Sequence, residues 1–549
     1  MKKSVLGFLI LSLPFLAFGQ FNKGIGTVKD QAGHSVQRTK VDPGFIVAGQ
    51  DRLSVFGAME ASIVKTKPDG TPQWSMVYGG VGNETFNSIR EIYNHDSVAI
   101  DGYAALGTTT SFASTEDLYF VRTDLSGTPL YSFTFGRREG NERGHCLQYI
   151  KDYATGKLGY IMAGQAGSYT YFGDSTDILI VKTDESGALT GAKVIGGTGD
   201  DIAYWVEQTS DGEFVVTGST TSMSASKDIF VMRLDKNLNI VWQTILYNRE
   251  VFSEDIGYSV VENPIDGSFT VTGFTTSFGL SNSQDAFLLN LRSDGSVNWM
   301  RTYGTEQPEQ GLSLDLSSGG KEYVVAGFAI DKIRGKDAWV FKTDIAGNPI
   351  WSNLYRASSD STELAAEITN DGGDGYVFTG TVESPLFTTN EDYYLVNLDV
   401  NGKTGACQNE FTRAWKKHEP STYKTFQAVD VKDIRVACTQ YEKADYSARK
   451  CFDRGGSLGE LAPQTVPTEV MSVSPNPTST SIKILFQDVD IKEDGGTIAV
   501  FDRNGKIVYK GAVTSDEMHI PVEGLPNDIY IVRFTTRDGK QYQTKFIKK

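Results

Sequence analysis

Residues 337–351 read DAWVFKTDIAGNPIW, and this order of an acidic residue, an apolar run, a polar turn and an aromatic residue returns along the chain. Three further copies are DLYFVRTDLSGTPLY (117–131), DIFVMRLDKNLNIVW (228–242) and DAFLLNLRSDGSVNW (285–299). Apolar runs of this length between turn residues are typical of β-strands, and Gly in a turn permits the positive φ of a tight hairpin. Each copy therefore predicts two strands joined by a hairpin.

Two independent markers place seven such units along the chain. A Gly that ends an apolar strand recurs at Gly49, Gly107, Gly164, Gly218, Gly273, Gly327 and Gly380, and the 331 residues from first to last divide into six intervals of about 55. The acidic residue that opens the next strand recurs at Glu60, Asp117, Asp177, Asp228, Asp285, Asp337 and Asp392. A regular period of this size indicates a repeat architecture.

One complete unit, residues 196–247, contains four strand-like runs: AYWVEQ, EFVVTG, DIFVMRL and NIVWQTIL. The middle runs are apolar on consecutive residues, as expected when both faces of a sheet are covered. Four strands in a period of about 40–60 residues are typical of a β-propeller blade. The sequence thus predicts an all-β protein with a seven-bladed β-propeller over residues 20–411.

The units also predict how the blades pack and how the ring closes. We expect the aromatic residues Trp74, Tyr131, Trp242, Trp299 and Trp351 to wedge between blades. Gly191 and Ala406 take the equivalent place in two units and break this pattern. The stretch FNKGIGTVKD (21–30) aligns with the end of a fourth strand, so we expect it to add the outer strand of the last blade.

The repeat resembles those of several propeller families. It is similar to tryptophan-docked propellers, including quinoprotein dehydrogenases, but it lacks the vicinal Cys pair of those enzymes. It also resembles the Asp-box hairpin of sialidases without its Ser-x-Asp-x-Gly spacing. The closer resemblance is to the Gly-Gly…Asp and Asp-Gly-Gly-Tyr propeller repeats of bacterial surface proteins.

The N-terminus and the composition indicate an exported protein. Residues 1–19 have a basic start, an apolar stretch and small residues at Ala17 and Gly19, which is the pattern of a secretory signal peptide. The net charge of −16 disfavours nucleic acid as a partner. We expect no membrane span and a monomer.

After a connecting segment and linker, residues 412–470, the last part of the chain predicts about seven short strands and a small Ig-like β-sandwich over residues 471–549. VSPNPTSTSIKI, VFDRNGKIVYKG, VEGLPNDIYIVRF and the terminal KFIKK resemble the C-terminal sorting domain of the type IX secretion system. Asp528 departs from the Gly usual in that family. The resemblance implies export through the type IX machinery, followed by release or surface attachment. A fibronectin-like accessory module is the alternative. The residues that carry the resemblance are Pro475, Asn476, Pro477, Asn504, Gly505, Lys506, Tyr530 and Lys545.

The four cysteines allow three full pairings. Cys146 lies in an apolar run and is expected to pack as a small core residue. Cys438 and Cys451 are candidates for a disulfide-stapled hairpin in a secreted protein.

Motifs that would identify an enzyme are missing from the sequence. Its five His residues form no zinc-binding pair, and there is no Gly-x-Ser-x-Gly elbow, nucleotide-binding glycine fingerprint or calcium loop. The sequence therefore predicts no catalytic residue, no metal site and no cofactor.

One recurrent polar position precedes the first strand of each unit: Gln31, Glu84, Glu142, Asp201, Asp255, Gln310 and Glu363. Because the first strand of a blade lines the central channel, these residues predict an acidic ring at one channel mouth. Two roles are open for it. The carboxylates either hold turns within their own blades or bind a cation or basic ligand.

Long, dissimilar loops on one face carry the candidate ligand-binding aromatics Phe56, Tyr169, Tyr171, Phe172, Phe278 and Phe387. The sequence favours a secreted or surface-attached binding or adhesion scaffold. The alternative is an extracellular enzyme that acts on polysaccharide or peptide through the same loop face.

Overall fold

The computed structural model describes residues 20–548, with gaps at 26–29, 41, 53–56, 94–99, 113–114, 137–139, 153–154, 168–174, 225, 247–252, 279–282, 332–334, 357–361, 371–374, 384–390, 405–407, 411–413, 419–426, 431–434, 443–444, 453–470, 475–479, 487–495, 503–505, 514, 516 and 537–540. Every regular element among these residues is a β-strand and none is a helix, which confirms the all-β prediction.

Six antiparallel sheets each contain four consecutive strands. They are β2 (Gln31–Thr39), β3 (Gly44–Arg52), β4 (Met59–Thr66) and β5 (Pro72–Tyr78); β6 (Glu84–Tyr93), β7 (Ile100–Thr109), β8 (Asp117–Thr123) and β9 (Pro129–Gly136); β10 (Glu142–Lys151), β11 (Leu158–Gly167), β12 (Thr176–Asp184) and β13 (Leu189–Gly196); β14 (Asp201–Gln208), β15 (Phe214–Thr220), β16 (Asp228–Leu234) and β17 (Ile240–Leu246); β18 (Asp255–Glu262), β19 (Phe269–Thr275), β20 (Asp285–Leu291) and β21 (Val297–Gly304); β22 (Glu309–Leu316), β23 (Glu322–Asp331), β24 (Gly335–Asp344) and β25 (Pro349–Tyr355).

A further sheet joins the two ends of the repeat region. It contains β26 (Glu363–Asn370), β27 (Tyr376–Glu383), β28 (Glu391–Leu398) and, at its outer edge, β1 (Phe21–Ile25). Phe21 lies opposite Asn397 and Ile25 opposite Tyr393 in the antiparallel pair. The prediction that the residues after the expected signal peptide complete the last sheet is confirmed.

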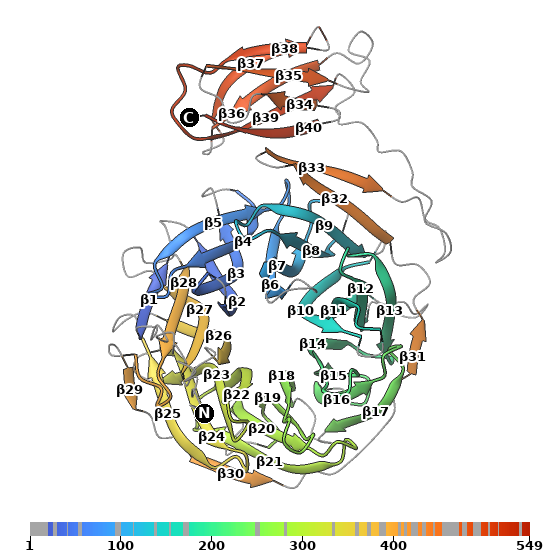
Figure 1. The fold of residues 1–549 in the computed structure, drawn as a ribbon, viewed down its shortest axis with the longest axis vertical. Coiled ribbons are helices and arrows are strands. Elements are labelled where there is room, and N and C mark those ends of the chain that lie inside the picture. Colours follow the sequence, from blue (N-terminus) through green and yellow to red (C-terminus); the bar gives the residue numbers. More distant parts are fainter. Residues whose placement is uncertain are drawn as a thin grey trace, which may run out of the picture.

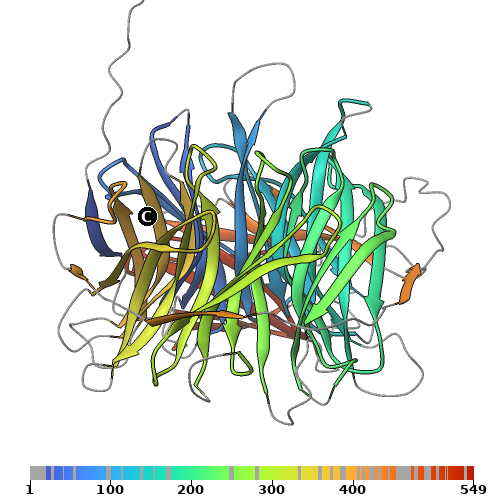
Figure 2. The same ribbon diagram turned by 90° about the horizontal axis from the view of Figure 1, so that it is seen from below.

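These sheets stand around a common centre in a propeller-like ring, with the first strand of each sheet innermost (Figure 1). The strands run along the axis of the ring (Figure 2). Middle strands are buried on consecutive residues, as all seven residues of β20 show. Consecutive burial follows because each sheet is packed between two neighbours.

At the contacts between neighbouring sheets, an aromatic side chain of one sheet packs against a turn glycine of the next. Trp74 of β5 packs on Gly127 in the turn of the next sheet, Trp299 packs on Gly347 and Trp351 on Gly402. These turn glycines have positive φ, between 72° and 79°, and a Cβ atom on any of them would overlap the indole ring. Gly is therefore required at these turns for two reasons: the backbone has a positive φ, and there is no space for a Cβ atom. Trp242 docks on Gly295 in the same way, so the predicted wedge is confirmed for the four tryptophans. At Gly187 the nearest ring is that of Phe133, and Tyr131 lies beside it.

Two junctions depart from this pattern. Phe21 of β1 packs on Gly70 and so supplies the aromatic residue that the last repeat lacks, while Ala406 lies outside the described residues. Gly191 of β13 faces Leu238, which takes the place of the turn glycine at a φ of 65° and is 2% exposed. A Cβ on Gly191 would lie 3.7 Å from the Leu238 side chain. The large and the small residue have exchanged places across this junction.

Short strands after residue 407, described by their backbone alone, add to the rims of four sheets. β29 (Gln408–Glu410) pairs with β25, β30 (Ala414–His418) with β21, β31 (Gln427–Asp430) with β13, and β32 (Arg435–Glu442) with β9. β33 (Asp445–Phe452) pairs with β32 and sets Cys438 opposite Cys451. The β32–β33 pair agrees with the candidate hairpin of Cys438 and Cys451, whereas β29, β30 and β31 were not predicted from the sequence.

The C-terminal region has its own core. A three-stranded sheet, β34 (Met471–Ser474), β35 (Ser481–Phe486) and β38 (Glu517–Pro521), and a four-stranded sheet, β36 (Gly496–Phe501), β37 (Ile507–Val513), β39 (Ile529–Thr536) and β40 (Gln541–Ile547), are both antiparallel. Buried residues of both sheets, including Ile482, Val500 and Phe546, form one apolar cluster.

The exchange between Gly191 and Leu238 predicts an energetic coupling. Gly191→Trp alone overpacks against Leu238 and should cost about 1–3 kcal/mol. Leu238→Gly alone relieves the left-handed φ but leaves a cavity, for a cost of about 2–4 kcal/mol. The double variant recreates the aromatic-on-glycine contact of the other junctions. Urea unfolding should therefore show a loss smaller than the sum of the single losses by about 1–3 kcal/mol.

The matched control combines Gly191→Trp with Leu125→Gly, a change in another turn where the leucine is 39% exposed. That pair should be additive. Additive losses for Gly191→Trp and Leu238→Gly would contradict the docking interpretation.

Candidate functional site: a polar cavity at the centre of the ring

The acidic position predicted before each inner strand is the first residue of that strand. Glu84, Glu142, Asp201, Asp255 and Glu363 are all at most 1% exposed. In the sixth unit the equivalent residue is Glu309, which is fully buried, and Gln310 follows it; the sequence alignment was wrong by one residue there.

These carboxylates bond to groups of adjoining turns. Asp255 accepts hydrogen bonds from the Thr275 hydroxyl at 2.6 Å and from the Ser277 amide and hydroxyl at 3.2 and 2.5 Å. Asp201 accepts from the Gly197 amide and the Ser222 hydroxyl, both at 2.7 Å. Of the two roles left open by the sequence, these contacts are those of carboxylates that hold turns.

At several junctions between neighbouring sheets, a second acidic residue lies close to one of these carboxylates. Burial, with a smaller contribution from Asp177, raises the pKa of Asp201 to about 6. Burial raises the pKa of Asp228 to about 7, and Asp255 adds to the effect. Asp228 Oδ1 has no hydrogen-bond donor among the described residues. At the junction after β25 the charge is balanced instead, because the Arg356 guanidinium pairs with Asp337.

The predicted loop aromatics are not brought together by the described structure. Phe56, Tyr169, Tyr171, Phe172 and Phe387 lie outside the described residues. Phe278 is half-buried against the apolar core between two sheets.

The residues of the predicted sorting signal are described only in part. Pro475, Asn476, Pro477, Asn504 and Gly505 lie outside the described residues. The Lys506 amide donates to Asp502 at 2.9 Å, the buried Tyr530 donates to the Pro526 carbonyl at 2.9 Å, and Lys545 pairs with Ile531 across β40 and β39.

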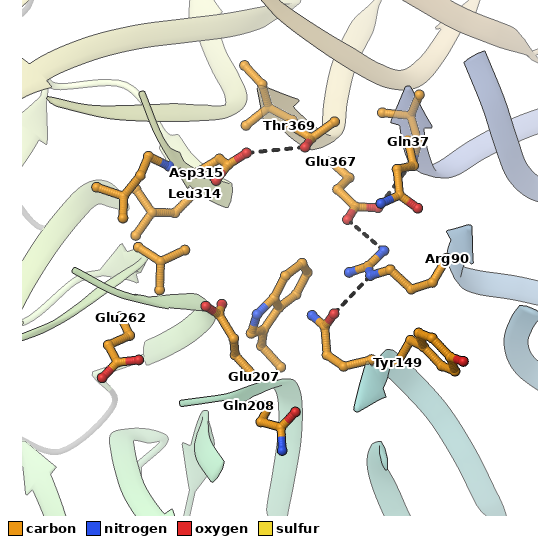
Figure 3. A pocket seen from close by; sticks show the side chains of 16 residues that line it. Gln37, Arg90, Tyr149, Glu207, Gln208, Glu262, Leu314, Asp315, Glu367 and Thr369 are labelled. Carbon is orange, nitrogen blue, oxygen red and sulfur yellow. Dashed lines mark hydrogen bonds and ion pairs between the residues drawn. The ribbon is translucent and has the colours of Figure 1, made fainter. Parts of the chain in front are cut away.

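A cavity of about 370 Å³ lies at the centre of the ring (Figure 3). All seven inner strands contribute to it, each through the sixth residue after its first: Gln37, Arg90, Gln148, Glu207, Val261, Asp315 and Thr369. A β-bulge precedes this position in every inner strand, for example between Gly33 and Ser35 in β2. The bulge adds one residue to the strand and so changes which side chains face the centre.

Arg90 organises one side of the cavity. Its Nη1 lies 3.2 Å from Glu367 Oε1 and its Nε donates to Gln148 Oε1 at 3.0 Å. The guanidinium is 5.6 Å from the centre of the Trp205 ring, within cation–π range. Glu367 also accepts the Val36 amide at 3.2 Å. Both side chains of the ion pair are nearly buried, and these bonds offset the cost of desolvating the two charges.

The other side of the cavity holds carboxylates without a matching cation. Burial raises the pKa of Glu207 to about 8; the nearby Asp315 and Glu262 carboxylates add to the effect, while Trp205 and the Glu262 amide oppose it. Burial also raises the pKa of Asp315, although this carboxylate accepts the Leu316 and Asn370 amides, both at 2.7 Å. Glu207 is therefore mostly protonated near neutral pH.

This cavity was not predicted from the sequence. Its residues differ in type from unit to unit, so no motif marks them. Their constant spacing of six residues from the acidic position was a usable signal once the seven units had been aligned. Among the described residues, no three His, Cys, Asp or Glu side chains gather closely enough to hold a metal ion.

The C-terminal region matches a known protein family. Residues 472–549 match the secretion system C-terminal sorting domain, as the sequence resemblance implied. The protein is therefore exported by the type IX secretion system, to the outer cell surface or the medium, and its tail interacts with that machinery. No described residues form a helix that is long and apolar enough to cross a membrane. No curated protein matches the sequence.

Similarity to solved structures is weak. The chain is 9% identical to the extracellular domain of a protein from B. thetaiotaomicron described as a one component system, with a TM-score of 0.36 over 96% of this chain and 58% of that chain. It thus spans less than two thirds of that domain. An apocarotenoid oxygenase of Synechocystis is also 9% identical, with a TM-score of 0.36 over 73% of this chain and 98% of that chain. With TM-scores this low, neither the fold nor the ligand of these proteins can be assigned to this chain.

The junction acids predict a specific dependence of stability on pH. Because the pKa of Asp228 is raised in the folded state, its protonated form is favoured by folding. Stability is then lost as the pH rises from the unfolded value of about 4 to about 7. Asp228→Asn should therefore be more favourable at pH 8 than at pH 4, by about 1–4 kcal/mol in the free energy of unfolding.

Asp235, at the other end of β16, is the matched control. Partial burial raises the pKa of Asp235, but hydrogen bonds from Asn239 and Asn237 outweigh this effect and hold the pKa below its ordinary value. Its contribution is present above the unfolded pKa, so Asp235→Asn should cost more at pH 8 than at pH 3. Equal pH profiles for the two variants would contradict the assignment.

Proposed function

We propose that this protein is a binding or adhesion scaffold, exported by the type IX secretion system, whose ligand enters the central cavity. The observation that carries the proposal is the cavity itself, to which each of the seven inner strands contributes one side chain at the same position. Concave sites with a few convergent polar groups are where proteins most often bind small ligands.

We further propose that residues 20–411 form a seven-bladed β-propeller. Support comes from the four-stranded sheets around one centre, and from β1, which supplies the outer strand of the sheet that contains β26. Residues 1–19 are proposed as the signal peptide, 412–470 as connecting segment and linker, and 471–549 as an Ig-like sorting domain. The protein is proposed to be a monomer.

A disulfide between Cys438 and Cys451 is proposed on the backbone register. The two residues are direct partners across the β32–β33 pair. Directly opposed residues in an antiparallel pair lie about 4.5–5.5 Å apart at Cα, which a disulfide can span.

The loop aromatics remain a second proposed contact. They follow the second strands of their sheets, whereas the cavity lies near the ends of the first strands. The two sites would therefore serve opposite faces of the ring. A large ligand could use the loops without entering the cavity.

An extracellular enzyme is the second candidate function. One observation favours it: Glu207 holds a proton near neutral pH, as a general acid must, and a second carboxylate, Asp315, lies nearby. Hydrolysis of glycans or peptides by the purified protein, lost in Glu207→Gln, would support this candidate over a binding scaffold.

The test of the proposed function uses the full exported chain and a set of small sugars, amino sugars and amino acids. Thermal shift should find at least one ligand, and isothermal titration should give its affinity. Gln148→Trp places a large ring in the cavity and should weaken binding at least tenfold, which is about 1.4 kcal/mol.

Val241→Trp, on the exposed face of β17, is the matched control and should bind like the native protein. If Gln148→Trp binds the ligand with unchanged affinity, the ligand lies elsewhere, and the proposed role of the cavity is wrong.

A further inference from the structure

We propose that the central cavity takes a small organic cation, an ammonium or guanidinium group, seated between Glu207 and Asp315. This inference rests on the proposed function, because it names the ligand class of the same cavity. Glu207 reaches toward the centre from β14 and Asp315 from β22, and no ion pair joins either carboxylate to another side chain drawn in the view (Figure 3). Between these two strands lies β18, which contributes the small apolar Val261 at the equivalent position.

The charges around the cavity do not balance. Among the residues that the structure describes, four carboxylates line it, those of Glu207, Glu262, Asp315 and Glu367, and Arg90 is the one lining cation. Arg90 is held by Glu367 and Gln148 on the far side. Glu262 accepts the Ser210 amide and hydroxyl at 2.6 and 2.9 Å, so its charge is met by the turn after β14. Glu207 and Asp315 line the cavity without an ion pair among the described residues, although the charge of Arg90 favours the ionised form of Asp315.

The carboxylates of Asp315 and Glu207 differ in their hydrogen bonds. Asp315 accepts two amides and the Thr369 hydroxyl, the last at 3.2 Å, and these neutral donors favour its ionised form. The charges of Asp315 and Glu262 oppose the ionisation of Glu207, while the Glu262 amide favours it. A ligand ammonium seated between these two carboxylates would favour the ionised form of both.

The remaining lining limits the size and type of ligand. A volume of about 370 Å³ is at the small end of ligand sites, which suits a single sugar or one side chain. Trp205 offers an aromatic face, while Gln37, Gln148 and Gln208 offer amide groups at the edge. An amino sugar and a lysine side chain share the required cation. Both are therefore probes of the same chemistry.

Binding of a cation should displace the Glu207 proton. With the pKa of this carboxyl raised to about 8, the empty cavity holds a proton at pH 7. A bound positive charge favours the ionised form, so about one proton leaves for each ligand bound. Affinity should then rise with pH up to about pH 8, by as much as tenfold per unit. A lysine probe remains charged throughout this range.

The experiment is isothermal titration of the full exported chain at pH 7 with pairs of matched probes. One pair is glucosamine and glucose; the other is Nα-acetyl-lysine amide and its neutral Nε-acetylated form. We expect the charged member of at least one pair to bind at least tenfold more tightly. Titrations in two buffers of different protonation enthalpy should show release of about one proton.

Glu207→Gln keeps the shape and neutrality of the protonated side chain and should fold normally. It should weaken the charged probe at least tenfold and abolish both proton release and the pH dependence. Glu254→Gln, at a side chain that is 49% exposed and outside the cavity, should change neither. Asp315→Asn should also weaken the charged probe.

Three outcomes overturn the inference: equal affinity for charged and neutral probes, no binding of either charged probe, or unchanged affinity in Glu207→Gln. If the charged and neutral members of each pair bind equally and Gln148→Trp abolishes their binding, the cavity is a ligand site but not a cation site. In that case the proposed function stands and only this inference fails.

Discussion

The contact between an aromatic side chain and the turn glycine of the next sheet sets the geometry of the whole ring. It repeats from Trp74 on Gly127 to Trp351 on Gly402, and Phe21 on Gly70 completes the set from the other end of the chain. Each contact fixes the spacing of two sheets at their rims, where a small angular error would accumulate around the circle. Hydrogen bonds reinforce it: Tyr78, Tyr303 and Tyr355 donate to the carbonyls of the same turn glycines at 2.6–2.7 Å.

Because the rims fix the ring, the centre is free to carry other chemistry. The middle strands are buried against their neighbours, and the junction acids tie turns to the beginnings of the inner strands. Near the ends of the inner strands, the bulge in each strand turns one side chain toward the cavity, and some of these side chains also accept an amide of the next inner strand, as Gln37 does from Glu91 and Asp315 from Asn370. A rigid frame with a variable centre is a suitable basis for preorganised binding.

The repeat made the ring predictable from sequence, since glycine, acid and aromatic residues recur with a period that follows from four strands and their turns. Closure by Phe21 was predictable because the first residues align with a fourth strand. The exchange of Gly191 and Leu238 was visible as two exceptions, but their contact was not, because nothing local links them. The cavity was even harder to predict from the sequence. It depends on bulges that sequence periodicity does not report, and its residues are defined by position rather than by type. The one-residue error at Glu309 shows the same limit.

The junction acids and the half-buried cavity acids Glu207 and Asp315 differ in a way that separates structure from function. Junction acids recur in nearly every unit, so the fold itself uses them, and their cost is shared with hydroxyl and amide donors. Glu207 and Asp315 do not recur: the equivalent positions hold Gln37, Val261 and Thr369, which shows that neutral residues satisfy the fold there. Burying a carboxylate without a cation is unfavourable, and perturbed pKa values of this kind gather at functional sites. A ligand that brings a positive charge would offset the cost that remains after these two carboxylates accept the neighbouring amides.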